Sequence, residues 1–315
     1  MLSILKMVVL NRLSITAAFL LLITSSSFAV WNIMAEGDGR LEYNEVDKIG
    51  AGLNLASLSI RKTTSDARGD RLIVFLNGEA ENNFKELMLH EAYVRYKGPL
   101  SLWNVTIGRF AIPFGTILSY ASSRYLWSGL EKYTLGLEAD DGLQISGVTE
   151  HFDYALAVTR GVGTHGDFEK LGEGLLTSRV AIPLDDEELF VLGVSGAAGR
   201  LQSHNRVEER MIGGLDGSFA FSRLNGRFEL AFGKSGMHTL AAASGIMDFP
   251  IYRWLEINSG ARYVMSGDVD MAAIYSGLTL RVKGFVIRGG YTYAYEEEQN
   301  QNAAVQLYYQ YSWNR

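Results

Sequence analysis

Apolar and polar residues alternate along almost the whole chain, most clearly in its final segment. From Val305 to Trp313 every second residue is apolar or aromatic, and those between are Gln, Tyr or Ser. Successive side chains of a β-strand point to opposite faces, so this segment has one apolar face that runs into an aromatic cluster. Such a face suits lipid contact followed by an interfacial aromatic girdle. An edge strand of a soluble sandwich alternates equally well, so this segment alone leaves both open.

Similar runs recur along the chain and can be counted as sixteen strands, from Gly39–Asp47 to Ala303–Trp313. An even number lets both termini lie in the periplasm. The runs Gly39–Asp47 and Thr239–Asp248 are weak, which leaves 14 or 12 strands as alternatives. The pattern therefore predicts an all-β fold, a transmembrane antiparallel β-barrel of about 16 strands that forms a single domain over residues 30–315.

The first 29 residues have the pattern of a secretory signal peptide. Lys6 and Arg12 supply a positive segment, Ile15 to Ile23 form an apolar run, and Ser27-Phe28-Ala29 is a small-x-small cleavage site. This order of features is typical of export signals. The apolar run is shorter than the about 20 residues that a membrane-spanning helix needs. We therefore predict an exported protein of the Gram-negative outer membrane.

Composition narrows the function classes. Removing Lys6 and Arg12 reduces the 29 basic residues to 27 against 35 acidic ones, a formal net charge of −8, which argues against a nucleic-acid partner. The chain has no cysteine, which excludes disulfides and thiolate metal sites. It is 47% hydrophobic, yet its apolar residues are spread one position in two, as in outer-membrane barrels.

The connections between the predicted strands differ in length. Tight turns are expected at Lys97-Gly98-Pro99, Leu224-Asn225-Gly226 and Lys283-Gly284, and longer polar loops at Gly161–Gly174, Arg200–Glu209 and Glu297–Asn302. Short periplasmic turns and longer external loops are typical of outer-membrane barrels. The longest connection, about residues 114–141, is rich in Leu, Tyr and Trp. Such a loop fits a position folded into the barrel, where it narrows the lumen, better than an external cap.

One stretch resembles a known family. Glu91–Lys97, a Gly-Pro turn, Val105–Phe110 and Pro113-Phe114-Gly115 resemble the strand, turn, strand and Pro-Phe that precede the inward loop in the phosphate-selective porin O and P family. The resemblance covers about residues 39–145 and is architectural beyond them. It implies a 16-stranded pore, a homotrimer, that passes small solutes. The basic ladder behind the family's phosphate preference has no residue-by-residue match here.

Alternation also assigns charged side chains to the lumen. The predicted pore-lining set is Arg95, Lys97, Arg262, Arg281, Arg288, Glu91 and Glu256, with Arg124 on the inward loop. Further lumen charges are expected at Arg179, Asp153, Asp216, Arg227 and Glu229. On the strand Leu87–Lys97, Met88 is expected to face lipid, and His90 has the same parity.

Two interpretations of these charges remain open. An arginine-lined narrowing raises the local anion concentration and favours anionic solutes. Charges of both signs also serve any porin by holding water in the lumen and tying strands together. Acidic residues at the external loops or their roots, among them Glu138, Asp140 and Asp141, are expected to keep those loops solvated, or to hold cations that bridge lipopolysaccharide.

Other signals are better explained without chemistry. Gly161-Val162-Gly163-Thr164-His165-Gly166 matches a dinucleotide-binding pattern, but a polar, glycine-broken segment follows it instead of a helix. The five histidines show no metal-ligand spacing or nucleophile context, so we predict no enzyme activity, cofactor or metal. We expect a passive channel for small hydrophilic solutes in contact with outer-membrane lipid and lipopolysaccharide. The alternative is a non-conducting structural or scaffold barrel.

Overall fold

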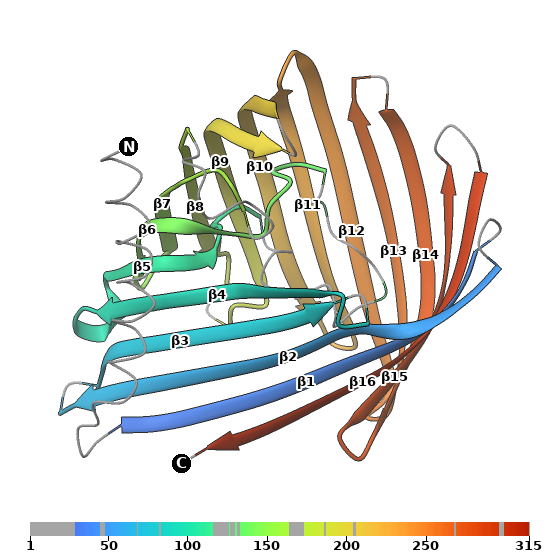
Figure 1. Ribbon diagram of the computed structural model, residues 1–315, viewed down its shortest axis with the longest axis horizontal. Coiled ribbons are helices and arrows are strands. Elements are labelled where there is room, and N and C mark those ends of the chain that lie inside the picture. Colours follow the sequence, from blue (N-terminus) through green and yellow to red (C-terminus); the bar gives the residue numbers. More distant parts are fainter. Residues whose placement is uncertain are drawn as a thin grey trace.

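The computed structural model describes residues 29–44, 48–67, 69–81, 83–115, 126, 130, 133–163, 173–185, 187–203, 206–267, 269–295 and 299–314. These residues form one closed barrel in which each strand pairs antiparallel with the next, and β1 pairs with β16 (Figure 1). The strands are β1 Ala29–Asn44, β2 Lys48–Asp66, β3 Gly69–Glu81, β4 Glu86–Lys97, β5 Asn104–Ala111, β6 Ala139–Val148, β7 Asp153–Thr159, β8 Leu175–Pro183, β9 Phe190–Ser203, β10 Arg206–Phe221, β11 Leu224–Ser235, β12 His238–Tyr252, β13 Leu255–Ser266, β14 Val269–Val282, β15 Phe285–Tyr295 and β16 Gln299–Asn314.

The predicted barrel of sixteen strands is confirmed, and the alternatives of 14 and 12 strands are wrong. The two weak runs correspond to full strands, β1 and β12. The predicted N-terminal signal peptide lies outside the described residues, apart from Ala29. A short 3-10 turn, η1 Pro99–Ser101, connects β4 to β5. Within the described ranges, no helix is long and apolar enough to cross a membrane.

The alternation read from the sequence matches the faces of β14 and β16. On β16 the residues from Val305 to Trp313 that were expected to face outward are exposed, whereas Gln306 and Tyr308 are buried on the inner side. On β14, Ile274 and Leu278 are exposed and Tyr275 is buried. The outward faces of these two strands are therefore apolar, and the period of two places the intervening residues inside the barrel.

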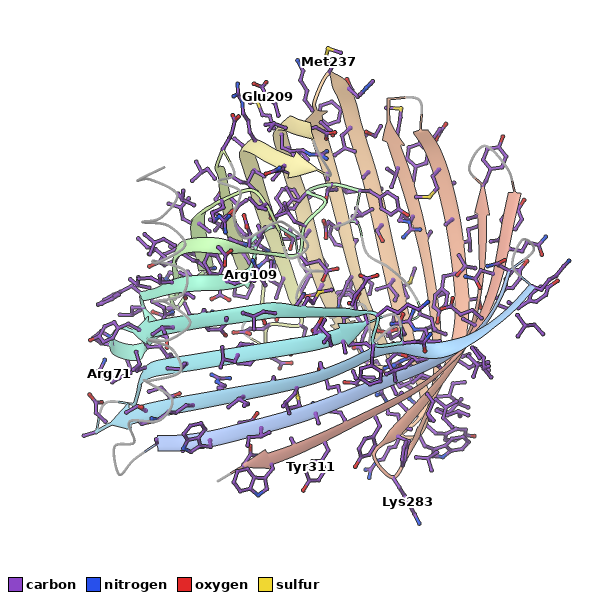
Figure 2. The ribbon with its side chains drawn as sticks, in the orientation of Figure 1. Arg71, Arg109, Glu209, Met237, Lys283 and Tyr311 are labelled. Carbon is purple, nitrogen blue, oxygen red and sulfur yellow. The ribbon has the colours of Figure 1, made fainter. Side chains whose placement is uncertain are left out.

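The two ends of the barrel differ. We call the end where β1 begins and β16 ends the turn rim, and the opposite end the loop rim; Lys283 marks the turn rim and Met237 the loop rim in Figure 2. Outward aromatic pairs gather at the turn rim, with ring centroids 5.6 Å apart for Tyr96 and Trp103 and 5.4 Å apart for Tyr252 and Trp254. Aromatic residues at such a level are typical of a membrane interface.

Two predicted connections are shorter than expected. The turn expected at Leu224-Asn225-Gly226 lies at Ser222-Arg223 instead, because β11 begins at Leu224, which pairs with Phe221. The loop placed at Arg200–Glu209 is largely strand, because β9 and β10 pair as far as Ser203 and Arg206. Polar residues that read as loop here continue the ladder at the loop rim.

The alternation breaks on β4. The register shifts between Asn77 and Gly78, which pair with Glu91 and Leu89, so His90 is the extra residue of a bulge. The expected outward position of His90 is wrong: its ring nitrogens lie 3.6 Å from a carboxylate oxygen of Glu79 and 3.4 Å from one of Glu138. Met88 was also assigned to the wrong face, because it pairs with the same Glu79.

Candidate functional site: the barrel lumen

The connection between β5 and β6 lies inside the barrel, as predicted, for those of its residues that the structure describes. Phe114, Leu130, Leu135 and Leu137 are buried in one apolar cluster with inward-facing residues of β8–β14. The wall residues of this cluster are Leu175, Ala197, Leu201, Ile212, Ala231, Leu240, Ala242, Val264 and Met271. Burial of these side chains stabilises the inward position, and the wall of β1–β5 contributes no residue to the cluster among those described.

The start of this connection is tied to the lumen wall by polar contacts. The Gly115 N–H donates to Ser195 Oγ at 3.0 Å, and the Ser195 hydroxyl donates to Asp216 at 3.3 Å. Arg179 donates to both oxygens of Asp216, at 3.1 and 2.6 Å. Gly115 has a φ of +70°, and a Cβ there would lie 2.5 Å from Glu229. Only glycine therefore fits this entry point without displacement.

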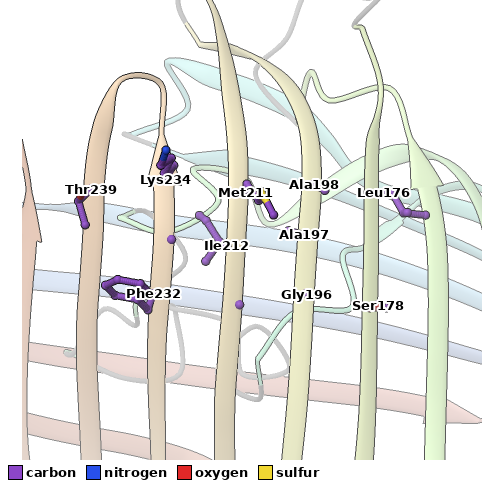
Figure 3. A pocket seen from close by; sticks show the side chains of 12 residues that line it. Leu176, Ser178, Gly196, Ala197, Ala198, Met211, Ile212, Phe232, Lys234 and Thr239 are labelled. Atoms are coloured by element: carbon purple, nitrogen blue, oxygen red, sulfur yellow. The ribbon is translucent and has the colours of Figure 1, made fainter.

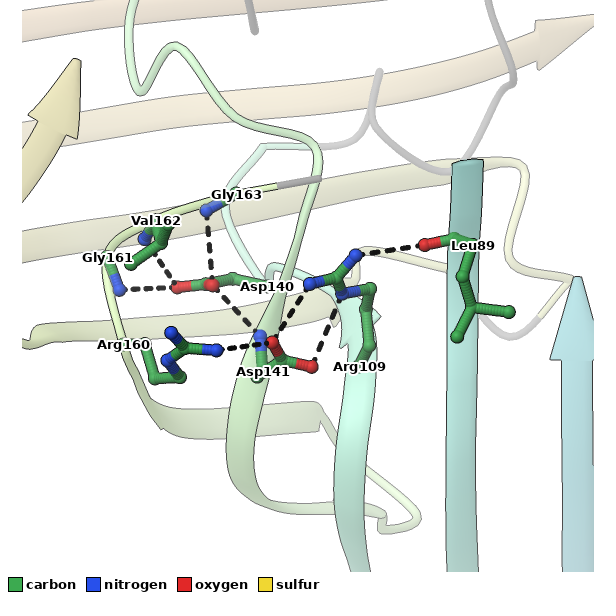
Figure 4. A network of polar contacts seen from close by, with 8 residues as sticks. All are labelled: Leu89, Arg109, Asp140, Asp141, Arg160, Gly161, Val162 and Gly163. Atoms are coloured by element: carbon green, nitrogen blue, oxygen red, sulfur yellow. Dashed lines mark hydrogen bonds and ion pairs between the residues drawn. The ribbon is translucent and has the colours of Figure 1, made fainter. Parts of the chain in front are cut away.

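The end of the connection is held by Asp140. Its fully buried carboxylate accepts hydrogen bonds from the backbone N–H groups of Gly161, Val162 and Gly163, the last two at 3.4 and 3.2 Å (Figure 4). Successive backbone N–H groups of this kind form an anion-binding nest. The expected solvating role of Asp140 is therefore wrong. Backbone N–H groups at 161–163, the start of the glycine pattern, thus bind a carboxylate of this chain.

The neighbouring Asp141 belongs to a second network (Figure 4). Arg109 on β5 donates to its two oxygens at 3.3 and 2.9 Å, and Arg160 donates to it at 3.0 Å. Arg109 also donates to the Leu89 carbonyl on β4 at 3.0 Å. Paired guanidinium–carboxylate contacts are among the stronger hydrogen bonds in proteins. This network links β4, β5, β6 and the end of β7 near the loop rim.

The predicted pore residues of β4 have different surroundings. Arg95 donates to Thr106 Oγ1 at 2.9 Å, and its guanidinium carbon lies 5.0 Å from the Tyr93 ring centroid. Lys97 lies at the turn rim with its Nζ 3.8 Å from Asp70. Glu91 accepts a hydrogen bond from the backbone N–H of Ala111 at 3.1 Å. Arg95, unlike Lys97, therefore makes no ion pair with a carboxylate among the described residues.

The other predicted residues lie on β13–β15. Arg281 is 3.3 Å from Glu256, whose other oxygen accepts from Asn258 at 2.8 Å. Arg262 lies 4.8 Å over the ring of Tyr133, which belongs to the inward connection. Arg288 is buried and donates to Gln306 at 2.8 Å. Arg124 lies outside the described residues. The set is thus spread over two walls of the lumen and forms no single site.

One further lumen arginine, Arg61 on β2, was not among the predicted residues. Its parity could have revealed it, because Ser57, four residues earlier, faces inward and donates to Glu36 at 3.0 Å. Register places Arg61 beside Phe75, which pairs with Tyr93. Within the described residues neither Arg61 nor Arg95 makes an ion pair. The β2–β5 wall therefore carries two arginines without an ion pair, and Glu91 lies near enough to Arg95 to interact with it electrostatically.

No group of three His, Asp or Glu residues suited to a metal ion occurs in the part of the chain that the structure describes. The charged residues instead pair across strands or with backbone groups, as the networks above show. The lumen therefore has charged and polar side chains on β1–β5. On the opposite side, the inward connection packs on an apolar cluster of β8–β14.

Comparison with known proteins finds structural neighbours but no match by sequence. No family model matches the chain, and no curated protein matches it by sequence. The anion-selective porin from Comamonas acidovorans superposes with a TM-score of 0.71 at 13% identity, covering 90% of this chain and all of that one. OmpT of Vibrio cholerae, in a trimer form, gives 0.72 at 11% identity with the same coverage.

OmpF of Salmonella typhi, solved with daunomycin, gives a TM-score of 0.69 at 11% identity over 89% of this chain and 97% of that one. The specific resemblance to the phosphate-selective O and P family is not confirmed, because no family model matches. At these identities the likeness concerns the fold. The chain has the closed β-barrel fold of the porins.

Proposed function

We propose that this protein is an outer-membrane porin, a passive diffusion channel for small hydrophilic solutes. The observation that carries the proposal is the inward connection inside a barrel of apolar exterior. Its described residues pack against β8–β14, opposite a wall of polar side chains on β1–β5. A polar passage narrowed by an inner loop admits small solutes and sets an upper limit on their size.

A weak anion preference belongs to the same proposal. Arg61 and Arg95 make no ion pair among the described residues, whereas Arg281 and Lys97 each form one with an acidic group. Fixed positive charge along a narrow aqueous passage raises the local concentration of anions. The anion selectivity named for the Comamonas acidovorans porin supports this part of the proposal.

The proposal includes the Gram-negative outer membrane as location, contact with its lipid and lipopolysaccharide, and no catalytic activity. It also includes a homotrimer, which the trimer form of the Vibrio cholerae neighbour supports. Crosslinking of the folded protein in detergent tests this part. A single monomer band under conditions that preserve the fold would contradict it.

Liposome swelling tests the channel. Vesicles that contain the folded protein should swell in isotonic solutions of small sugars, at rates that fall with sugar size, while protein-free vesicles should not. Equal rates with and without protein would contradict the proposal and favour a non-conducting barrel. Reversal potentials in a salt gradient test the anion preference, and a cation-selective wild type would refute it.

A further inference from the structure

A groove lies on the outer face of the barrel across β8–β12, close to the loop rim (Figure 3). Its volume is about 600 Å³, which falls within the roughly 300–1,000 Å³ of small-molecule binding sites. Leu176, Met211 and Phe232 line it and are all exposed. The groove is therefore apolar and faces the surroundings of the barrel, away from the lumen.

The hollow arises from one row of small residues that is bordered on the turn-rim side by a row of larger ones. In the central row Ser178 pairs with Gly196 and Gly196 with Gly213, and the row ends at Phe232. The next row toward the turn rim, residue by residue across the strands, is Val180, Val194, Leu215 and Leu230. Because Gly196 and Gly213 have no side chain, the central row is a trough one row wide, and the Phe232 ring closes its β11 end.

The backbone does not require these two glycines. Neither Gly196 nor Gly213 has a positive φ, and a Cβ at either would have no neighbour closer than 3.5 Å and 3.9 Å respectively. At Gly233, by contrast, a Cβ would lie 2.0 Å from the Met211 carbonyl oxygen. The space over Gly196 and Gly213 is thus real room on the surface, and larger side chains would fill it without strain.

Charge marks one end of the groove. Lys234 borders it at the loop-rim end, beside the turn between β11 and β12 (Figure 3). Lys234 is exposed and makes no ion pair within the described residues. The nearby outward cation Arg200 is already paired with Glu173 and Glu209. An apolar trough that ends at an uncompensated cation is complementary to an acyl chain with an anionic headgroup.

We propose that this groove seats an acyl chain of lipid A, with a phosphate of that glycolipid bound to Lys234. The inference rests on the proposed outer-membrane location, which places the loop rim at the outer leaflet. The position of the charge fits this orientation, because Lys234 lies on the loop-rim side of the groove. Each methylene that enters the trough adds apolar burial, and the lysine adds a salt-dependent contact.

Native mass spectrometry of the folded full-length protein tests the proposal, with hexa-acyl, bisphosphorylated lipid A as the probe. Wild type should retain one lipid A. Lys234→Gln should weaken retention about fivefold, the effect of roughly one interfacial lysine contact, and the double variant Gly196→Leu/Gly213→Leu should weaken it more. Lys85→Gln, at another connection of the loop rim, and Gly37→Leu, where an added Cβ meets nothing within 4 Å, are the controls and should retain lipid A as wild type does.

Unchanged retention in both groove variants would overturn the proposal. Equal retention of phosphatidylglycerol would overturn the commitment to lipid A. If wild type forms oligomers that carry no lipid, and the groove variants lose these oligomers, the groove would be assigned to a second copy of the chain and the proposal overturned. Conductance distinguishes this inference from the proposed function. The groove variants should conduct as wild type does, because the groove lies outside the lumen, and lipid retention can be measured even in a barrel that does not conduct.

Discussion

The buried Asp140 carboxylate should contribute more to stability than any other single group at the loop rim. Asp140→Asn keeps the size of the side chain but replaces one acceptor oxygen by an NH₂ donor that faces backbone N–H groups. Hydrogen bonds to a charged group contribute about 1.5–3 kcal/mol each. Counting only the contacts to Gly161 and Gly163, and leaving out the long one to Val162 and the one from the adjacent Asp141 N–H, the carboxylate contributes about 3–6 kcal/mol. Losing one of the two oxygens should lower the free energy of unfolding by about half of that.

Urea unfolding of the folded protein in detergent, followed by Trp fluorescence, measures this loss. Amide exchange of Gly161 and Gly163 should also accelerate, by about tenfold for each 1.4 kcal/mol of local stability lost. The matched control is Asp153→Asn, because Asp153 is exposed and its side chain makes no hydrogen bond or ion pair within the described residues. Equal unfolding free energies for the two variants, with unchanged exchange at Gly161 and Gly163, would refute the reasoning.

Three further predictions concern the lumen. Arg95→Gln should lower the anion-to-cation permeability ratio by up to about fourfold, because a unit charge roughly 10 Å from a passing ion in water favours an anion and disfavours a cation by about 0.4 kcal/mol each; an unchanged reversal potential would contradict this. Glu256→Gln should raise the anion preference and Arg281→Gln should lower it, since each variant frees the charge of its partner; shifts of the same sign would show that the pair does not face the ion path. His90→Asn should reduce the free energy of unfolding by about 1 kcal/mol or less, as expected for a partly exposed ion pair, and a stabilised variant in urea unfolding would contradict the bulge contacts.

Strand identity and facing could be predicted from the sequence because a period of two needs only local information. β16 shows this well, since each outward residue from Val305 to Trp313 is exposed as expected. The position of His90 could not be predicted in this way. Its direction depends on the register shift between Asn77 and Gly78 on the neighbouring strand, and register is a property of the pair.

The lumen charges could be located but their partners could not. Arg281 and Glu256 are 25 positions apart, and their contact depends on the pairing of β13 with β14. Asp140 binds backbone groups that a loop brings to it from more than 20 positions away, and no side-chain pattern encodes that contact. The anion that the glycine pattern at 161–163 binds could therefore not be predicted. The inward position of Arg61 could be predicted from the alternation, because it has the parity of Ser57.

The central claim is that the lumen conducts, and single-channel recording in planar lipid bilayers tests it most directly. Purified, folded protein added at low concentration should give discrete and reproducible conductance steps. Wild type should also show a reversal potential of the sign for anion preference in a salt gradient. Membranes that show insertion of folded protein by its heat-modifiable mobility, yet give no discrete steps, would contradict the account.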